Sequence, residues 1–262
     1  MTSTLDRILD GVRAGLPALA SRREALEQAA RRAPPAPDFK AALRRPEVAV
    51  IAELKRKSPS AGLLAPRLDS AARARTYEAG GAAALSVLTE ADHFGGSLSD
   101  LEGVAAVVTV PLIRKDFILH ELQVIEARAS GAAAVLLIVR ALDPSALRDL
   151  LAAARRWGME ALVETHDERE VDLALAAGAT VIGVNSRDLG DFTINAKAAW
   201  ALLRQLPSDI VAVAESGMKD VAAVEAAAAA GADAVLVGSA LSVADDPGPL
   251  LAGMAAVPRH GR

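Results

Sequence analysis

A phrase that recurs four times along the chain, a glycine followed by small and then apolar residues, constrains the fold most. It occupies residues 81–88, 131–138, 178–184 and 231–238, and each copy follows an alanine-rich stretch with helical spacing. Glycine commonly ends a helix, and a short apolar run bounded by turn residues is typical of a buried strand. The phrase therefore predicts four helix-to-strand junctions.

Four more short apolar stretches alternate with these junctions, at residues 48–54, 111–116, 160–166 and 210–216. Eight strands, each separated from the next by room for a helix, predict an α/β fold of the (β/α)8 TIM-barrel type, which typically takes about 250 residues. An open, doubly wound sheet is the main alternative. Even spacing favours the barrel, as does the lack of a G-x-G-x-x-G turn after the first strand.

Residues 1–46 precede the first strand, and a barrel does not need them. Helical spacing is kept by five apolar residues of this segment, Leu5, Ile8, Leu9, Val12 and Leu16, and a proline-rich stretch at 33–37 ends a second helix. We expect residues 1–262 to form a single barrel domain with this segment as a docked helical extension. The extension would serve either as a cover for an apolar rim or as a lid or wall of the pocket.

Composition excludes several kinds of site and partner. The net charge is −4, and the basic residues are scattered among acids, which argues against a nucleic-acid partner. The absence of cysteine excludes disulfides, thiolate nucleophiles and zinc-thiolate sites. The four histidines have no metal-ligand spacing, so we expect no metal. No apolar run reaches the length of a membrane span or signal peptide, so we expect a cytoplasmic protein without a membrane partner.

Charged side chains stand at the ends of the odd-numbered strands. Glu53 and Lys55 share the face of Ala49 and Ile51, which should be interior because side chains alternate along a strand. By the same alternation, three more charged residues point inward from later strands: Lys115, Glu164 and Glu215. Alternate strands of a barrel contribute to one layer, which predicts a ring of mixed charge at the mouth. A purely structural salt-bridge layer is the alternative, although burying several ions costs more than packing apolar groups.

The last two strand ends carry a different signal. Ser216 and Gly217 follow the seventh strand, and Gly238 and Ser239 follow the eighth. Backbone N–H groups and hydroxyls in such turns can surround an anion, and these two loops form the usual phosphate site of the fold. The turns therefore predict a phosphate-bearing ligand, unless the glycines serve only to make tight turns.

Taken in order, the strand-end motifs resemble those of the indole-3-glycerol-phosphate synthase family. The resemblance covers essentially the whole chain, extension included, and is carried by seven motifs: IAELKRKSPS at 51–60, SVLTE at 86–90, LIRKDFI at 112–118, LVE at 162–164, GVNSRDL at 183–189, AESG at 214–217 and VGS at 237–239. It implies a carboxy-lyase of tryptophan biosynthesis. Such an enzyme converts 1-(2-carboxyphenylamino)-1-deoxyribulose 5-phosphate into indole-3-glycerol phosphate, with loss of carbon dioxide and water.

The resemblance also implies roles for individual residues. Lys115 would be the general acid that protonates the ketone oxygen as the aromatic carbon attacks. Lys55 would hold the substrate carboxylate and share proton delivery, and Glu164 would be the acid/base group for dehydration and rearomatisation. Glu53 and Asn185 would orient the lysines and the substrate hydroxyls.

The remaining implied residues bind the substrate. Arg187 and Glu215 would lie near its hydroxyls, and the phosphate would be received by the first loop and the last two strand ends: Ser58, Ser60, Ser216, Gly217, Gly238 and Ser239. The partner implied is thus a small molecule with a phosphate and a carboxylate, bound without a metal or organic cofactor. We expect a monomer, with other tryptophan-pathway enzymes as the protein partners to consider.

Three residues depart from the family pattern. Ser186 stands where a second asparagine is expected, Leu122 replaces a common tyrosine, and Asn195 stands where aspartate is usual. None removes an implied catalytic group, and we expect Ser186 to be tolerated because a short hydroxyl can still form hydrogen bonds. Two other functions remain open: a Schiff-base aldolase with Lys115 as nucleophile, and a phosphosugar-binding barrel without turnover.

Overall fold

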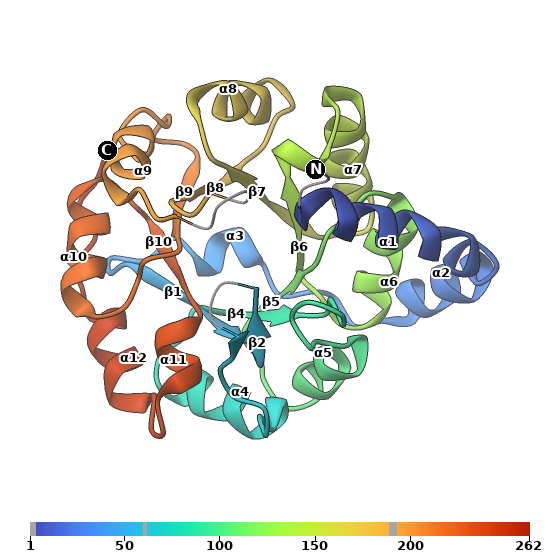
Figure 1. Ribbon diagram of the computed structural model, residues 1–262, viewed down its shortest axis with the longest axis horizontal. Coiled ribbons are helices and arrows are strands. Elements are labelled where there is room, and N and C mark those ends of the chain that lie inside the picture. The colour runs from blue at the N-terminus through green and yellow to red at the C-terminus, as the bar shows by residue number, and fades with distance from the viewer. Residues whose placement is uncertain (1–3, 60–61, 189–192) are drawn as a thin grey trace.

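A closed barrel of parallel strands forms the centre of the computed structural model, which describes residues 4–59, 62–188 and 193–262 (Figure 1). Its eight described strands are β1 (Ala49–Leu54), β4 (Ala84–Leu88), β5 (Leu112–Lys115), β6 (Ala134–Ile138), β7 (Glu160–Thr165), β8 (Val181–Asn185), β9 (Val211–Glu215) and β10 (Ala234–Val237). Neighbours in the chain pair in this order, and β1 closes the ring by pairing with β10 and β4. The predicted (β/α)8 barrel is confirmed.

Helices surround the barrel, as Figure 1 shows: α4 (Ser70–Ala79), α5 (Leu98–Ala105), α6 (Glu121–Ala129), α7 (Pro144–Arg156), α8 (Glu168–Ala176), α9 (Ala196–Leu203), α10 (Val221–Ala229) and α12 (Gly248–Ala255). Short elements at strand ends are η1 (Val139–Ala141) and α11 (Ser239–Val243), and a hairpin of β2 (Lys57–Ser58) and β3 (Gly62–Leu63) lies in the loop after β1. The glycines of the recurring phrase have left-handed backbones, with φ between 85° and 94°, at Gly81, Gly131, Gly178 and Gly231. They make the predicted helix-to-strand junctions.

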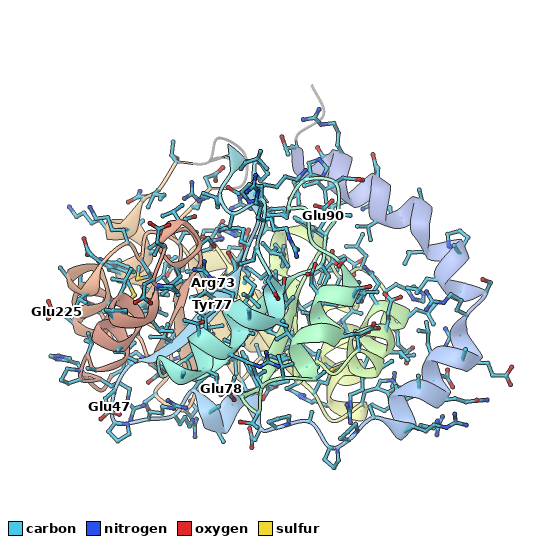
Figure 2. The ribbon with its side chains drawn as sticks, turned by 90° about the horizontal axis from the view of Figure 1, so that it is seen from below. Glu47, Arg73, Tyr77, Glu78, Glu90 and Glu225 are labelled. Atoms are coloured by element: carbon cyan, nitrogen blue, oxygen red, sulfur yellow. The ribbon has the colours of Figure 1, made fainter. Side chains whose placement is uncertain are left out.

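The N-terminal extension forms three helices, α1 (Thr4–Ala20), α2 (Arg23–Arg32) and α3 (Phe39–Ala42). Leu26 and Ala30 of α2 pack on Leu122 and Ile125 of α6, outside the barrel. Figure 2, a side view, shows α1 and α2 along one flank of the molecule. Within its described part, the extension contributes no residue to the wall of the cavity at the mouth. Helix α1 instead lines a second cavity of about 320 Å³ together with the loop after β4, so the choice between cover and lid stays a prediction.

The short helix α3 closes the opposite end of the barrel. Phe39 and the following Leu43 are buried against inward-facing residues of the strands, among them Ala49, Ile51 and Ile113. Glu47, just before β1, and Glu90, just after β4, mark the two ends of the barrel in Figure 2. The interior is therefore packed with apolar side chains from α3 upward, and it becomes polar only at the carboxyl ends of the strands.

Strand register confirms which polar residues face inward. Paired residues on adjacent strands point to the same face, and Glu53 pairs with Ser86, Glu164 with Gly183, and Asn185 with Glu215. Glu53, Glu164, Asn185 and Glu215 lie at or next to the carboxyl ends of their strands. The alternation of the sequence thus predicted the inner face correctly.

Candidate active site

A cavity of about 680 Å³ opens at the carboxyl ends of the barrel strands, and residues from all eight strands or their loops line it. The wall contains every predicted site residue within the described part of the chain: Glu53, Lys55, Ser58, Lys115, Glu164, Asn185, Arg187, Glu215, Ser216, Gly217, Gly238 and Ser239. Ser60 lies outside the described residues. The mouth of the barrel therefore gathers side chains that are far apart in sequence into one pocket.

Lys115 lies between two carboxylates from different strands. Its Nζ is 3.0 Å from Oε2 of Glu164 on β7 and 3.0 Å from Oε2 of Glu215 on β9. The lysine side chain is 13% exposed, whereas the two glutamates are 3% and 2% exposed. Asn185 donates a hydrogen bond of 3.0 Å to Oε1 of Glu164 and so fixes that carboxylate from its other side.

The protonation states of this group follow from burial and mutual attraction. Burial lowers the pKa of Lys115, but the carboxylates of Glu164, Glu215 and Glu53 outweigh it and raise the pKa above its ordinary value. Burial raises the pKa of Glu164, but Lys115 and His166 together bring it down to about 2. Near neutral pH the site therefore holds an ammonium ion at Lys115 and a carboxylate at Glu164.

Glu215 behaves differently from Glu164 although both contact the same lysine. Burial raises the pKa of Glu215, Lys115 lowers it, and the nearby carboxylate of Glu164 raises it again, for a net value of about 7. Two carboxylates that share one cation in a buried site cannot both ionise at low cost. Glu215 is therefore the member of the group that exchanges a proton near neutral pH.

A second lysine–carboxylate pair comes from β1 and the residue after it. Lys55 Nζ lies 2.8 Å from Oε1 of Glu53, and the two side chains are 14% and 5% exposed. The loop that follows is anchored by Arg56, which donates to both carboxylate oxygens of Asp100 at 2.7 and 2.6 Å. This anchor holds Ser58 at the edge of the cavity.

The turns after β9 and β10 lie side by side, because these strands pair directly. Ser216 and Gly217 both have left-handed backbones, with φ of 64° and 77°. A non-glycine residue rarely adopts this conformation, and it is typical of functional turns. Together with Gly238 and Ser239 in the next turn, these residues offer backbone N–H groups and hydroxyls to an anion.

The structure explains two of the three departures from the family pattern through local contacts. The hydroxyl of Ser186 donates to the backbone carbonyls of Glu215 and Ser216, at 3.1 and 3.3 Å. Asn195 caps α9 by accepting a hydrogen bond of 3.1 Å from the N–H of Ala198. Leu122 lies away from the cavity, buried under α2. Each substitution is compatible with an intact site.

Sequence reasoning missed the apolar wall of the cavity. Phe94 and Phe117 form a tilted pair with ring centroids 6.4 Å apart, and Leu136, Ile138 and Leu236 also line the pocket. Alternation along the strand predicts the same inward face for Phe117 as for Lys115, although β5 itself ends at Lys115. Phe94 lies in the loop after β4, where no periodic pattern exists to reveal its direction.

His166 lies directly after β7, with its side chain buried rather than exposed to solvent. Its side chain is 4% exposed, with Nδ1 3.0 Å from Glu170 and Nε2 3.4 Å from Glu164. Burial lowers the pKa of His166, but the hydrogen bond with Glu170 and the charge of Glu164 raise it overall. The residue supports Glu164 from the side away from Lys115.

Fold and site together define a class: a TIM-barrel acid–base enzyme whose mouth combines lysine–carboxylate pairs with an anion-binding turn. A family model described as indole-3-glycerol phosphate synthase matches residues 5–251. The chain is 50% identical to the indole-3-glycerol phosphate synthase of Mycobacterium ulcerans, across 98% of this chain and 96% of that one. It is 49% identical to that of Streptomyces griseus, across 99% of both. The chain belongs to the indole-3-glycerol phosphate synthase family.

Among solved structures, a thiamine phosphate pyrophosphorylase from Pyrococcus furiosus matches with a TM-score of 0.61 and 16% identity, over 81% of this chain and 95% of that one. At this identity the likeness concerns the fold alone. Within the described residues, no group of His, Asp and Glu is arranged to hold a metal ion, and no helix has the length and apolar character needed to cross a membrane.

Proposed function

We propose that this carboxy-lyase performs the ring closure for which its family is named. The substrate would be 1-(2-carboxyphenylamino)-1-deoxyribulose 5-phosphate, and the products indole-3-glycerol phosphate, carbon dioxide and water. The observation that carries the proposal is the ammonium group of Lys115, held 3.0 Å from both Glu164 and Glu215 at the wall of the mouth cavity.

Lys115 is the proposed acid for the first step. The aromatic carbon that bears the carboxylate attacks the ketone carbon, and a proton from Lys115 converts the ketone oxygen into a hydroxyl group. A cation fixed by two carboxylates stabilises the negative charge that develops on this oxygen without having to reorganise. Carbon dioxide then leaves, and the electron pair of the broken bond returns to the aromatic ring.

Glu164 is the proposed base for the last step. Loss of the hydroxyl group as water requires a proton on the oxygen, and removal of a proton from the neighbouring ring carbon forms the indole double bond. The pKa of Glu164, lowered to about 2, keeps the side chain ionised, which is the form that a base requires. Asn185, hydrogen-bonded to the same carboxylate, keeps it oriented. Lys55 would deliver a proton to the departing hydroxyl group.

The rest of the cavity matches the four other parts of this substrate. Lys55, supported by Glu53, offers a cation to the benzoate carboxylate. The phosphate would bind to Ser58 and the two turns after β9 and β10, which provide hydroxyl and N–H donors, and Arg187 would contact the chain hydroxyls. Phe94 and Phe117, with the aliphatic wall, suit the flat aromatic ring.

We also propose a monomeric enzyme that acts in the cytoplasm. Every group used in these steps comes from one chain, so a second subunit is not needed for the chemistry. The substrate carries a phosphate and a carboxylate, and such an anion does not cross a membrane unaided. Other enzymes of the tryptophan pathway remain the protein partners to test, by co-purification.

A Schiff-base aldolase would use the same lysine as a nucleophile, and it needs the neutral amine. The two carboxylates that raise the pKa of Lys115 disfavour that form. Borohydride reduction in the presence of substrate distinguishes the two mechanisms. We expect no mass increase on Lys115, and a stable adduct at that residue would contradict the acid role.

The experiment that tests the proposal is to mix the purified protein with the carboxyphenylamino-deoxyribulose phosphate and to follow the fluorescence of the indole product. We expect the initial rate of the fluorescence increase to be proportional to the enzyme concentration. Binding of the substrate without any rise would favour the phosphosugar-binding barrel instead.

A further inference from the structure

Two glycines on the inner wall of the barrel lack the usual conformational reason for glycine. Gly183 lies in the middle of β8, where its φ is not positive, and Gly238 follows β10 with a φ of −115°. A glycine in a strand destabilises the strand relative to alanine. Where such a residue is kept without a special φ, close approach of another group is the usual cause.

At Gly183 the approaching group is the carboxylate of Glu215. A Cβ atom on Gly183 would overlap Oε1 of Glu215, and it would lie 3.1 Å from Cδ of the same side chain and 3.2 Å from Cδ1 of Leu162. Gly183 pairs with Glu164 on β7 and with Val213 on β9, and Glu215 is the next inward residue after Val213. The Cα atom of Gly183, which carries no side chain, therefore lies beside the group formed by Lys115 and its two carboxylates.

The two oxygens of Glu215 have different surroundings. Oε2 lies 3.0 Å from Nζ of Lys115, whereas Oε1, the atom over Gly183, is buried without a hydrogen-bond partner among the described residues. The side chain is thus held by an ion pair at one oxygen and by the shape of the wall at the other. A side chain at residue 183 would fill this volume and leave no room for the observed rotamer of Glu215.

The second glycine repeats the arrangement for the other lysine. A Cβ atom on Gly238 would overlap Oε1 of Glu53, and it would lie 3.1 Å from Cδ of Glu53 and 2.8 Å from Nζ of Lys55. Lys115 and Lys55 therefore each have a carboxylate partner that occupies the volume beside a glycine. This repetition argues that the volumes are part of the site.

We propose that Gly183 and Gly238 are positioning residues for the reaction: their missing side chains leave the volumes in which Glu215 and Glu53 hold the ammonium groups of Lys115 and Lys55. The inference rests on the proposed function, because it concerns the geometry of that acid–base group. A side chain at residue 183 would turn Glu215 away and remove one of the two carboxylates from Lys115.

Gly183 offers the cleaner test, because Gly238 also belongs to the proposed phosphate site. We expect Gly183→Ala to lower kcat by roughly 10- to 100-fold, the cost of a misplaced catalytic group, while KM changes much less. The matched control is Gly103→Ala on α5, where a Cβ atom meets nothing within 4 Å. That variant should retain wild-type kinetics.

A double-mutant cycle separates positioning from a merely structural effect. In a Glu215→Ala background the displaced carboxylate is gone, so Gly183→Ala should lower kcat less than about twofold further. An equal loss in both backgrounds would overturn the inference. If Gly183→Ala alone does not fold, the double variant should regain folding because its cavity accommodates the methyl group, and failure of both would also overturn it.

A third measurement does not depend on turnover. Displacing Glu215 should remove its contribution to the pH dependence of the unfolding free energy, so Gly183→Ala should resemble Glu215→Gln in this respect. If the wild type lacked lyase activity, the proposed function would fail. This comparison would still test whether Gly183 positions the side chain of Glu215. A pH dependence in Gly183→Ala equal to that of wild type would contradict the positioning of Glu215 by Gly183.

Discussion

Replacing Glu215 with glutamine tests whether its buried carboxyl group holds a proton in the folded protein. Burial raises the pKa of this group, Lys115 opposes the shift and Glu164 reinforces it, so that the pKa moves from 4.5 to about 7. Between these two values the folded protein binds a proton that the unfolded chain has released. The free energy of unfolding must therefore fall as the pH rises through this window.

The magnitude follows from the displacement of the pKa. Each pH unit between the two values is worth about 1.4 kcal/mol, so the whole window corresponds to about 3 kcal/mol. Over an accessible range from about pH 5 to about pH 8, the two titration curves predict that Glu215 alone removes about 2 kcal/mol of stability. Glutamine does not titrate, so Glu215→Gln should lack this decrease.

Urea unfolding followed by circular dichroism measures the effect, for wild type and Glu215→Gln at both pH values. The control is Glu225→Gln, on an exposed position of α10 that points away from the barrel (Figure 2). We expect the control to lose as much stability as wild type between the two pH values, and Glu215→Gln to lose about 2 kcal/mol less. Equal losses in all three proteins would refute the assignment of a proton to Glu215.

Other perturbations test the frame of the site and its binding surface. Arg114→Met should lower the unfolding free energy by about 3–5 kcal/mol in chemical denaturation, because Asp116 and Glu126 each lie 3.0 Å from the guanidinium. The change leaves Asp116 buried without its cation and Glu126 with only the exposed Arg22, 3.5 Å away. Phe39→Ala should cost about 3–5 kcal/mol by emptying the closed end of the barrel; a loss below about 1 kcal/mol would show that α3 is not part of the core. Ser239→Ala should raise KM about tenfold and leave kcat nearly unchanged, as expected for one lost hydrogen bond to a phosphate, and a fall confined to kcat would contradict its binding role.

The barrel could be predicted from the sequence because its signals are local. Each glycine at a helix end and each apolar run after it is read within about ten residues, and alternation along a strand then assigns Lys115, Glu164 and Glu215 to the inner face. The closed order of strands agrees with that prediction. These local signals carry no information on the distances between side chains on opposite strands of the barrel.

Distances across the barrel decide the chemistry, and they depend on residues far apart in the chain. The sequence predicted a ring of mixed charge that contains Lys115 and Glu215, whereas only the structure shows that these two side chains, 100 residues apart, are in direct contact. Gly183 has no side chain and so adds nothing to a periodic pattern. Phe94, in a loop, likewise has no spacing that predicts its direction into the cavity.

The choice between cover and lid for the extension was also beyond the sequence. Helical spacing predicted α1 but could not say which surface it meets. Packing of Leu26 on Leu122 and burial of Phe39 inside the barrel place α2 and α3, and both contacts join the extension to elements that follow it in the chain. Helix α1 faces the loop after β4.

The central claim is that Lys115, held between Glu164 and Glu215, is the acid that drives ring closure. The most direct test is the rate of indole fluorescence on mixing saturating carboxyphenylamino-deoxyribulose phosphate with wild type, with Lys115→Ala and with a control, Lys197→Ala, on an exposed position of α9. We predict wild-type kcat for the control and a kcat at least about 100-fold lower for Lys115→Ala, with the substrate still bound. A kcat for Lys115→Ala close to that of wild type would contradict the claim.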